Sequence, residues 1–137
     1  MSAKLLLRLA AVLMLLHTIG HVIAMLTWKQ APDAQNQKVV AAMQDTHFQF
    51  GGKEVSYGSF YEGSGINLIF TMLLITLLLW ILSANKQPAV VAALTIFLFF
   101  FAVTEYIYFF PFAATFSFLA CICAGLSLFT KHTSKKG

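Results

Sequence analysis

Long apolar blocks alternate with short polar stretches along this chain. Four blocks run from about residues 5–28, 60–82, 89–108 and 112–129. Each is close to the roughly 20 residues that an α-helix needs to cross a bilayer core, and a helix satisfies its backbone polar groups internally. The pattern therefore predicts an all-α integral membrane protein with four transmembrane helices, forming a single domain over residues 1–137.

The connections between the last three blocks are short and contain proline. The link 83–88 ends on Pro88, a residue that favours a helix start. Pro111 separates the third block from the fourth, because proline disfavours helical geometry in the residue before it. Helices joined by short links lie antiparallel, so we expect an antiparallel four-helix bundle.

The long connection, residues 29–59, carries a helical pattern of its own. Asp33 is a good N-cap, and Gly51-Gly52 is a good stop signal. The pattern predicts a short amphipathic helix between them, lying on the outer membrane surface or forming a lid over the bundle. Its apolar face is expected to carry Val39, Val40, Met43, Thr46, His47 and Phe50.

Composition agrees with a membrane protein. The chain is 59% hydrophobic and 10% charged, whereas soluble domains carry about 25% charged residues, so a water-exposed globule would lack polar surface. The net charge of +4 does not indicate nucleic acid, because the nine basic residues form no patch of five or more. The lipid bilayer is the expected partner, and oligomerisation remains open.

Lysine and arginine predict the orientation. With the N-terminus inside, six basic residues lie on the cytoplasmic side, and the longer outer loop carries only three scattered lysines. The positive-inside rule therefore predicts that both termini are cytoplasmic. The residues then on the cytoplasmic side are Lys4, Arg8, Lys86, Lys131, Lys135 and Lys136. An alternative is a signal peptide cleaved after residues 22–24, which would remove most of the first block.

Two histidines, His17 and His21, lie one helical turn apart inside the first block. Ionisable side chains are costly in a bilayer, so each calls for a partner and usually for a purpose. At about 1.5 Å per residue, both lie past the midplane towards the outside, at a depth similar to that of Glu105. We therefore predict an outer-leaflet polar pocket, under a lid that carries His47; its expected lining is His17, His21, Glu62, Asn67 and Glu105.

Three interpretations of this pocket compete. The first is binding of a proton or a small amphipathic ligand, because histidine changes its charge near physiological pH. The second is a metal-dependent membrane enzyme, with Zn, Fe or Mn bound by His17, His21 and Glu105. The third is a structural or accessory subunit in which these groups only hydrogen-bond across helices. The sequence shows no phosphate loop, nucleophile elbow or Ser/His/Asp pattern. Whether the protein is an enzyme is therefore not decided by any such motif.

Two motifs carry a resemblance to a known family. Residues 56–65 read SYGSFYEGSG, which is similar to the pattern S-Y-x-x-F-Y-x-G-x-G, and residues 17–21 read HTIGH. Together they resemble a family of small uncharacterised bacterial four-helix inner-membrane proteins. The resemblance covers most of the chain in layout and implies a bacterial inner-membrane location. It assigns no activity and no catalytic residue.

Overall fold

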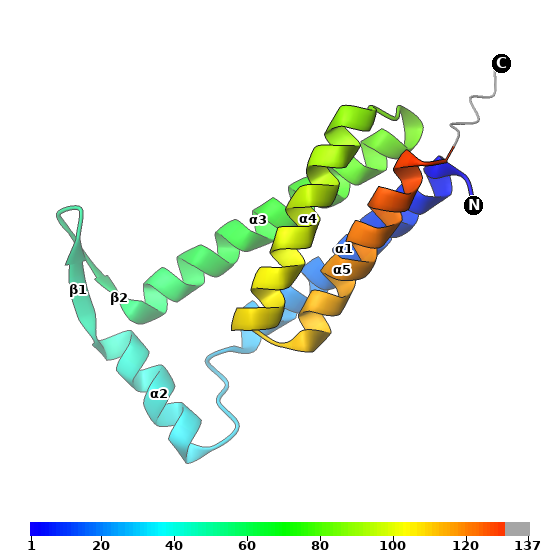
Figure 1. Cartoon of the computed structure of the whole chain (residues 1–137). Coiled ribbons are helices and arrows are strands. Elements are labelled where there is room, and N and C mark those ends of the chain that lie inside the picture. The colour runs from blue at the N-terminus through cyan, green and yellow to red at the C-terminus, as the bar shows by residue number, and fades with distance from the viewer. Residues whose placement is uncertain (131–137) are drawn as a thin grey trace. The chain divides into compact units, whose positions relative to one another are not determined.

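The computed structural model describes residues 1–130 (Figure 1). Four helices are long and apolar enough to cross a membrane, namely α1 (Ala3–Thr27), α3 (Tyr57–Ala84), α4 (Pro88–Tyr108) and α5 (Pro111–Leu128). The shorter elements α2 (Ala34–Asp45), β1 (His47–Phe50) and β2 (Lys53–Ser56) connect α1 to α3. The predicted all-α fold with four spanning helices is confirmed, and the chain is a multi-pass membrane protein. Three of the lysines used above for orientation lie outside the described residues: Lys131, Lys135 and Lys136.

Contacts divide the chain into two compact units. The first contains residues 1–18 and the chain from residue 72 onward, and the second contains residues 19–71. Helices α1 and α3 each run from one unit into the other. Pro88 and Pro111 are the first residues of α4 and α5, where a missing backbone N–H leaves no helical hydrogen bond unmade.

Small residues on α5 build the core of the first unit. Buried Ala114, Ser117, Cys121 and Ala124 recur at spacings of three and four residues, and such a stripe lets a neighbouring helix approach closely. On α4, the backbone oxygen of Thr95 accepts a hydrogen bond from Cys121 Sγ at 3.3 Å. Larger side chains complete this core, including Leu7, Met14, Met72, Leu79 and Leu98.

Lys86, in the link between α3 and α4, caps the C-terminal end of α5. Its Nζ donates to the backbone oxygens of Ser127 at 2.6 Å, Thr130 at 3.2 Å and Leu128 at 3.4 Å. Carbonyl groups at a helix C-terminus lack intrahelical donors and carry partial negative charge. The ammonium group therefore satisfies the end of α5 and fixes the α3–α4 link against it.

The amphipathic helix of the second unit is shorter than its pattern predicts. Asp33 is its N-cap as expected, and Asp33 Oδ1 accepts the backbone N–H of Asn36 at 2.8 Å. However, α2 ends at Asp45, and an antiparallel hairpin follows. Gly51 and Gly52, with φ of +59° and +79°, form its two-residue turn, since successive positive φ values match the twist of paired strands. The predicted helix through Phe50 is therefore wrong.

His47 is accordingly not on the apolar face of a helix. It is exposed at the start of β1, and its Nδ1 lies 2.9 Å from the backbone oxygen of Asp45. The hairpin packs through Phe48, whose ring centroid lies 4.8 Å from that of Tyr57 and 6.1 Å from that of Phe60. The second unit thus places an aromatic side chain, rather than His47, against the start of α3.

Candidate functional site

Three polar side chains from three helices form a buried hydrogen-bonded chain in the first unit. His17 of α1 lies at its centre. Its Nε2 is 3.2 Å from Oε1 of Glu105 on α4, and its Nδ1 is 3.1 Å from Oγ of Ser117 on α5. His17 is 7% exposed, Glu105 5% and Ser117 0%. The unit therefore encloses an imidazole between a carboxyl group and a hydroxyl group.

Each of the three polar residues lies on the buried face of its own helix. Residues three positions apart on a helix share a face, so a polar residue at that spacing from a core residue is carried into the core. The buried residues three positions earlier are Met14 on α1, Ala102 on α4 and Ala114 on α5. The packing that buries the helices thus brings the three polar groups together.

Aromatic rings border the imidazole of His17. The ring centroid of Phe101 on α4 lies 6.4 Å from it, and that of Phe116 on α5 lies 6.0 Å from it with the rings stacked. Both phenylalanines are themselves held by a further ring, Phe97 and Phe112 respectively. Because apolar surroundings screen charge weakly, the interaction between the imidazole and the carboxyl group is stronger here than in water.

Ser117 was not predicted as a site residue. Other hydroxyl groups on these helices donate to their own backbone, as Thr104 and Thr115 do to the carbonyl four residues earlier at 2.9 and 2.8 Å. Ser117 instead reaches His17 on another helix. One signal in the sequence points to it, namely a hydroxyl within the small-residue stripe of α5, where a neighbouring helix comes close.

The pair of His17 and Glu105 can hold one proton in two ways. An imidazolium can donate from Nε2 to a carboxylate, or a neutral carboxylic acid can face a neutral imidazole. Oε2 of Glu105 is buried and makes no hydrogen bond to the residues that the structure describes. Ser117 serves either form, since its hydroxyl can donate to Nδ1 or accept from it. The contacts of both side chains are thus compatible with either position of the proton.

A serine, a histidine and a carboxyl group joined by hydrogen bonds also occur in acyl-transfer enzymes. Two features distinguish the buried site of this protein from the active sites of those enzymes. Ser117 is fully buried, so a substrate carbonyl cannot approach its Oγ. It also lies in the interior of α5, where backbone N–H groups are bonded within the helix and cannot stabilise an oxyanion. The surroundings of Ser117 therefore differ from those of a catalytic serine.

The remaining predicted residues belong to the second unit. Glu62 forms an ion pair with Lys29 at 2.6 Å, and its Oε1 also accepts from Trp28 Nε1 at 3.3 Å. Nε2 of His21 is buried and makes no hydrogen bond to any group between residues 1 and 130. Asn67 is exposed, and its backbone oxygen accepts from the hydroxyl of Thr71 at 2.9 Å. Glu62 thus joins the ends of α1 and α3 through Lys29.

The structure brings together His17 and Glu105 from the predicted set. His21, Glu62 and Asn67 have the separate surroundings just described. Within residues 1–130, no three His, Cys, Asp or Glu side chains gather closely enough to hold a metal ion. Among the described residues, His17 and Glu105 place two possible ligands side by side, whereas tetrahedral zinc sites use three or four from the protein. The predicted ligand set of His17, His21 and Glu105 stays a prediction.

Comparison of the chain with protein-family models, with curated proteins and with solved structures finds no match. A function is therefore proposed from the geometry of His17, Glu105 and Ser117.

Proposed function

We propose that this chain is a proton-binding, pH-responsive membrane protein, with the proton held between His17 and Glu105. The observation that carries the proposal is the 3.2 Å approach of His17 Nε2 to Glu105 Oε1 at a buried position of two spanning helices. Ionisable groups at such positions are costly, and they commonly mark proton relays and other functional sites.

The response follows from the charge of the pair. With one proton, either an ion pair or two neutral groups, its net charge is zero. Loss of that proton leaves a carboxylate beside a neutral imidazole, and a second proton leaves an imidazolium beside a neutral acid. A single uncompensated charge is expensive away from water. Each change therefore weakens the contact that the pair makes between α1 and α4.

A proton fits this site better than the small amphipathic ligand that the sequence also allows. Both side chains of the pair are more than nine-tenths buried and already bonded to each other. An amphipathic ligand would have to separate His17 from Glu105 before reaching either group. A proton needs no such rearrangement.

We place the protein in the bacterial inner membrane with both termini in the cytoplasm. Two observations support the location: the resemblance of residues 17–21 and 56–65 to bacterial inner-membrane proteins, and the basic residues near the α1 N-terminus and in the α3–α4 link. Those residues are Lys4, Arg8 and Lys86. Reporter fusions after Trp28 and at the C-terminus test this topology, and a periplasmic C-terminus would contradict it.

Infrared difference spectroscopy tests the proton site directly. Protein in lipid nanodiscs is cycled between about pH 5 and pH 8, the range in which histidine ordinarily titrates. We expect a carboxyl band that disappears in Glu105→Gln and persists in Glu62→Gln. Glu62 is the matched control, because it is the other acidic residue of a spanning helix and is ion-paired at the surface. A wild-type band unaffected by Glu105→Gln would overturn the proposal.

Two further measurements separate the competing interpretations. Stoichiometric zinc, iron or manganese in the purified protein, lost from a His17→Ala/His21→Ala variant, would favour the metal-dependent enzyme. The structural interpretation makes a different prediction. In that case Glu105→Gln would lower stability, but the wild type would show no pH-dependent carboxyl or imidazole signal. Imidazole protonation is followed by nitrogen-15 spectroscopy of labelled histidine, with His17→Gln assigning the signal.

A further inference from the structure

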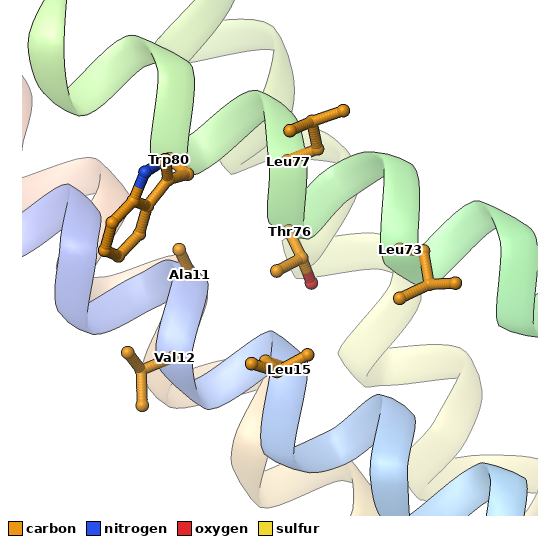
Figure 2. A pocket seen from close by; sticks show the side chains of 7 residues that line it. All are labelled: Ala11, Val12, Leu15, Leu73, Thr76, Leu77 and Trp80. Carbon is orange, nitrogen blue, oxygen red and sulfur yellow. The ribbon is translucent and has the colours of Figure 1, made fainter.

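An apolar groove lies between the parts of α1 and α3 that belong to the first unit. Figure 2 shows Ala11, Val12 and Leu15 along α1, beside a row on α3 in which Trp80 stands at one end and Leu73 at the other. Its volume is about 420 Å³, within the range of small-molecule sites. Thr76 and Leu77 complete the lining.

The groove opens to the outside of the first unit rather than into its core. Its larger lining side chains are between 41% and 55% exposed; they are Val12, Leu15, Leu73, Leu77 and Trp80. The one hydroxyl, that of Thr76, donates to the backbone oxygen of Met72 at 2.9 Å, so its hydrogen is already engaged. An occupant that matches this lining is therefore apolar, as a lipid acyl chain is.

One end of the groove is cationic. Arg8 Cζ lies 4.9 Å from the centroid of the Trp80 ring, a cation–π contact that fixes the guanidinium beside that end. Lys4, one helical turn before Arg8, is exposed on the same face of α1. Arg8 is about 8 Å from the start of α1, and Trp80 is about 6 Å from the end of α3. Arg8 therefore lies within the first two turns of α1 and Trp80 within the last two turns of α3, at the same end of the groove.

Within the described part of the first unit, no carboxylate pairs with this cationic end. Glu105 is the one acidic side chain in residues 1–18 and 72–130, and it is bonded to His17. The charge of Arg8 is thus uncompensated by side chains of its own unit. A basic residue near an anionic membrane surface contributes favourably to lipid binding.

We propose that the α1–α3 groove binds one anionic phospholipid of the surrounding bilayer. One acyl chain lies along the groove from Trp80 towards Leu73, and the phosphate is held by Arg8 with Lys4 beside it. This occupant matches both ends of the site, because an acyl chain fits the apolar lining and a phosphate fits a guanidinium. A spanning helix of a second copy would match the apolar lining alone.

Fluorescence quenching by brominated lipid tests the proposal. Trp28 and Trp80 are the two tryptophans of the chain, so Trp28→Phe leaves Trp80 as the reporter at the groove. The protein is reconstituted in phosphatidylcholine vesicles containing either brominated phosphatidylglycerol or brominated phosphatidylcholine at equal mole fraction. We expect the anionic lipid to bind at Trp80 about fivefold more strongly, the ratio for one basic residue near an anionic surface. Equal quenching by both lipids would overturn the proposal.

Two variants locate the site, with a matched control for each. Arg8→Gln should remove the preference for the anionic lipid, and Lys53→Gln, in the hairpin, should keep it. Val12→Phe adds bulk within the groove and should weaken quenching by both lipids. Leu16→Phe, an exposed position of α1 outside the lining, should not. A preference for the anionic lipid that survives Arg8→Gln would also overturn the proposal. So would the absence of quenching by either lipid in a protein that sediments as a dimer.

Circular dichroism of each variant confirms that its helices are intact. Arg8→Lys keeps the charge and retains a measurable test if Arg8→Gln does not fold. It should preserve most of the preference for phosphatidylglycerol, and its loss in a folded Arg8→Lys protein would contradict recognition by charge.

Discussion

His17 on α1 and Glu105 on α4 approach to 3.2 Å between Nε2 and Oε1, and both side chains are more than nine-tenths buried. Glu105→Ala would leave the imidazole nitrogen without this partner. We expect the free energy of unfolding to fall by about 1–3 kcal/mol, the cost of a buried polar group whose partner is removed. Unfolding in mixed detergent micelles measures it. A Glu105→Ala protein as stable as the wild type would show that the contact contributes nothing.

Replacing both members by leucine separates stability from function. Removing one partner of a buried pair is costly, whereas replacing both by apolar groups is often nearly neutral. We expect His17→Leu/Glu105→Leu to be more stable than Glu105→Leu alone, in a double-mutant cycle at one detergent composition. The same double variant should lose the pH-dependent infrared signal. Strictly additive losses would mean that the two residues act independently.

Sequence reasoning identified His17 and Glu105 because ionisable residues inside long apolar runs are conspicuous. It could not identify Ser117 in the same way, because hydroxyl groups are common in such helices and usually bond to their own backbone. Which hydroxyl faces a neighbour depends on the rotation of α5 about its axis, and the apolar pattern leaves that rotation open. His21 shows the same limit: it shares a helical face with His17 but belongs to the other unit.

Lys86 provides a prediction about stability far from the buried pair. Lys86→Met keeps much of the aliphatic stem but removes the donor that reaches three backbone oxygens at the end of α5. We expect a loss of about 0.5–2 kcal/mol, the range for a cation at a partly buried helix C-terminus. Hydrogen exchange should accelerate in the last turn of α5. Lys53→Gln, an exposed lysine, serves as the control and should leave this exchange unchanged.

The ion pair of Glu62 with Lys29 should behave differently. Both side chains are partly exposed, and exposed pairs contribute little because water screens them and their side chains must be ordered. We expect Glu62→Gln to leave the thermal midpoint nearly unchanged. The emission of Trp28 should shift, since its indole N–H donates to the Glu62 carboxylate at 3.3 Å. A large loss of stability would show that this pair is more protected than its exposure indicates.

The connection between α1 and α3 shows where a hydrophobic pattern misleads. Val39, Val40 and Met43 lie at helical spacing, and continuing that count places His47 and Phe50 on the same face. Yet residues 47–56 also read as two short runs around Gly-Gly, which is a hairpin signal. The glycines decide between these readings, because two successive residues with positive φ suit a tight turn and disfavour a helix. The Asp33 cap was predictable because it depends on local chemistry alone.

The turn therefore supplies the final prediction. Gly52 has φ of +79°, a conformation that costs a residue with a Cβ about 1–2 kcal/mol. We expect Gly52→Ala to weaken the hairpin and to accelerate hydrogen exchange of the β1 and β2 amides by about tenfold. Gly51→Asn should be tolerated, because Asn-Gly is a preferred pair in this turn.

Gly20→Ala is the matched control for this loss. Gly20 lies within α1, and a Cβ there would meet no atom within 4 Å among the described residues, apart from its chain neighbours and the adjoining helix backbone. Alanine favours helix over glycine, so this change should be neutral or slightly stabilising and should leave the hairpin amides unaffected. If Gly52→Ala and Gly20→Ala altered hairpin exchange equally, the positive φ would not be the cause. If neither altered it, the turn would impose no conformational demand on Gly52.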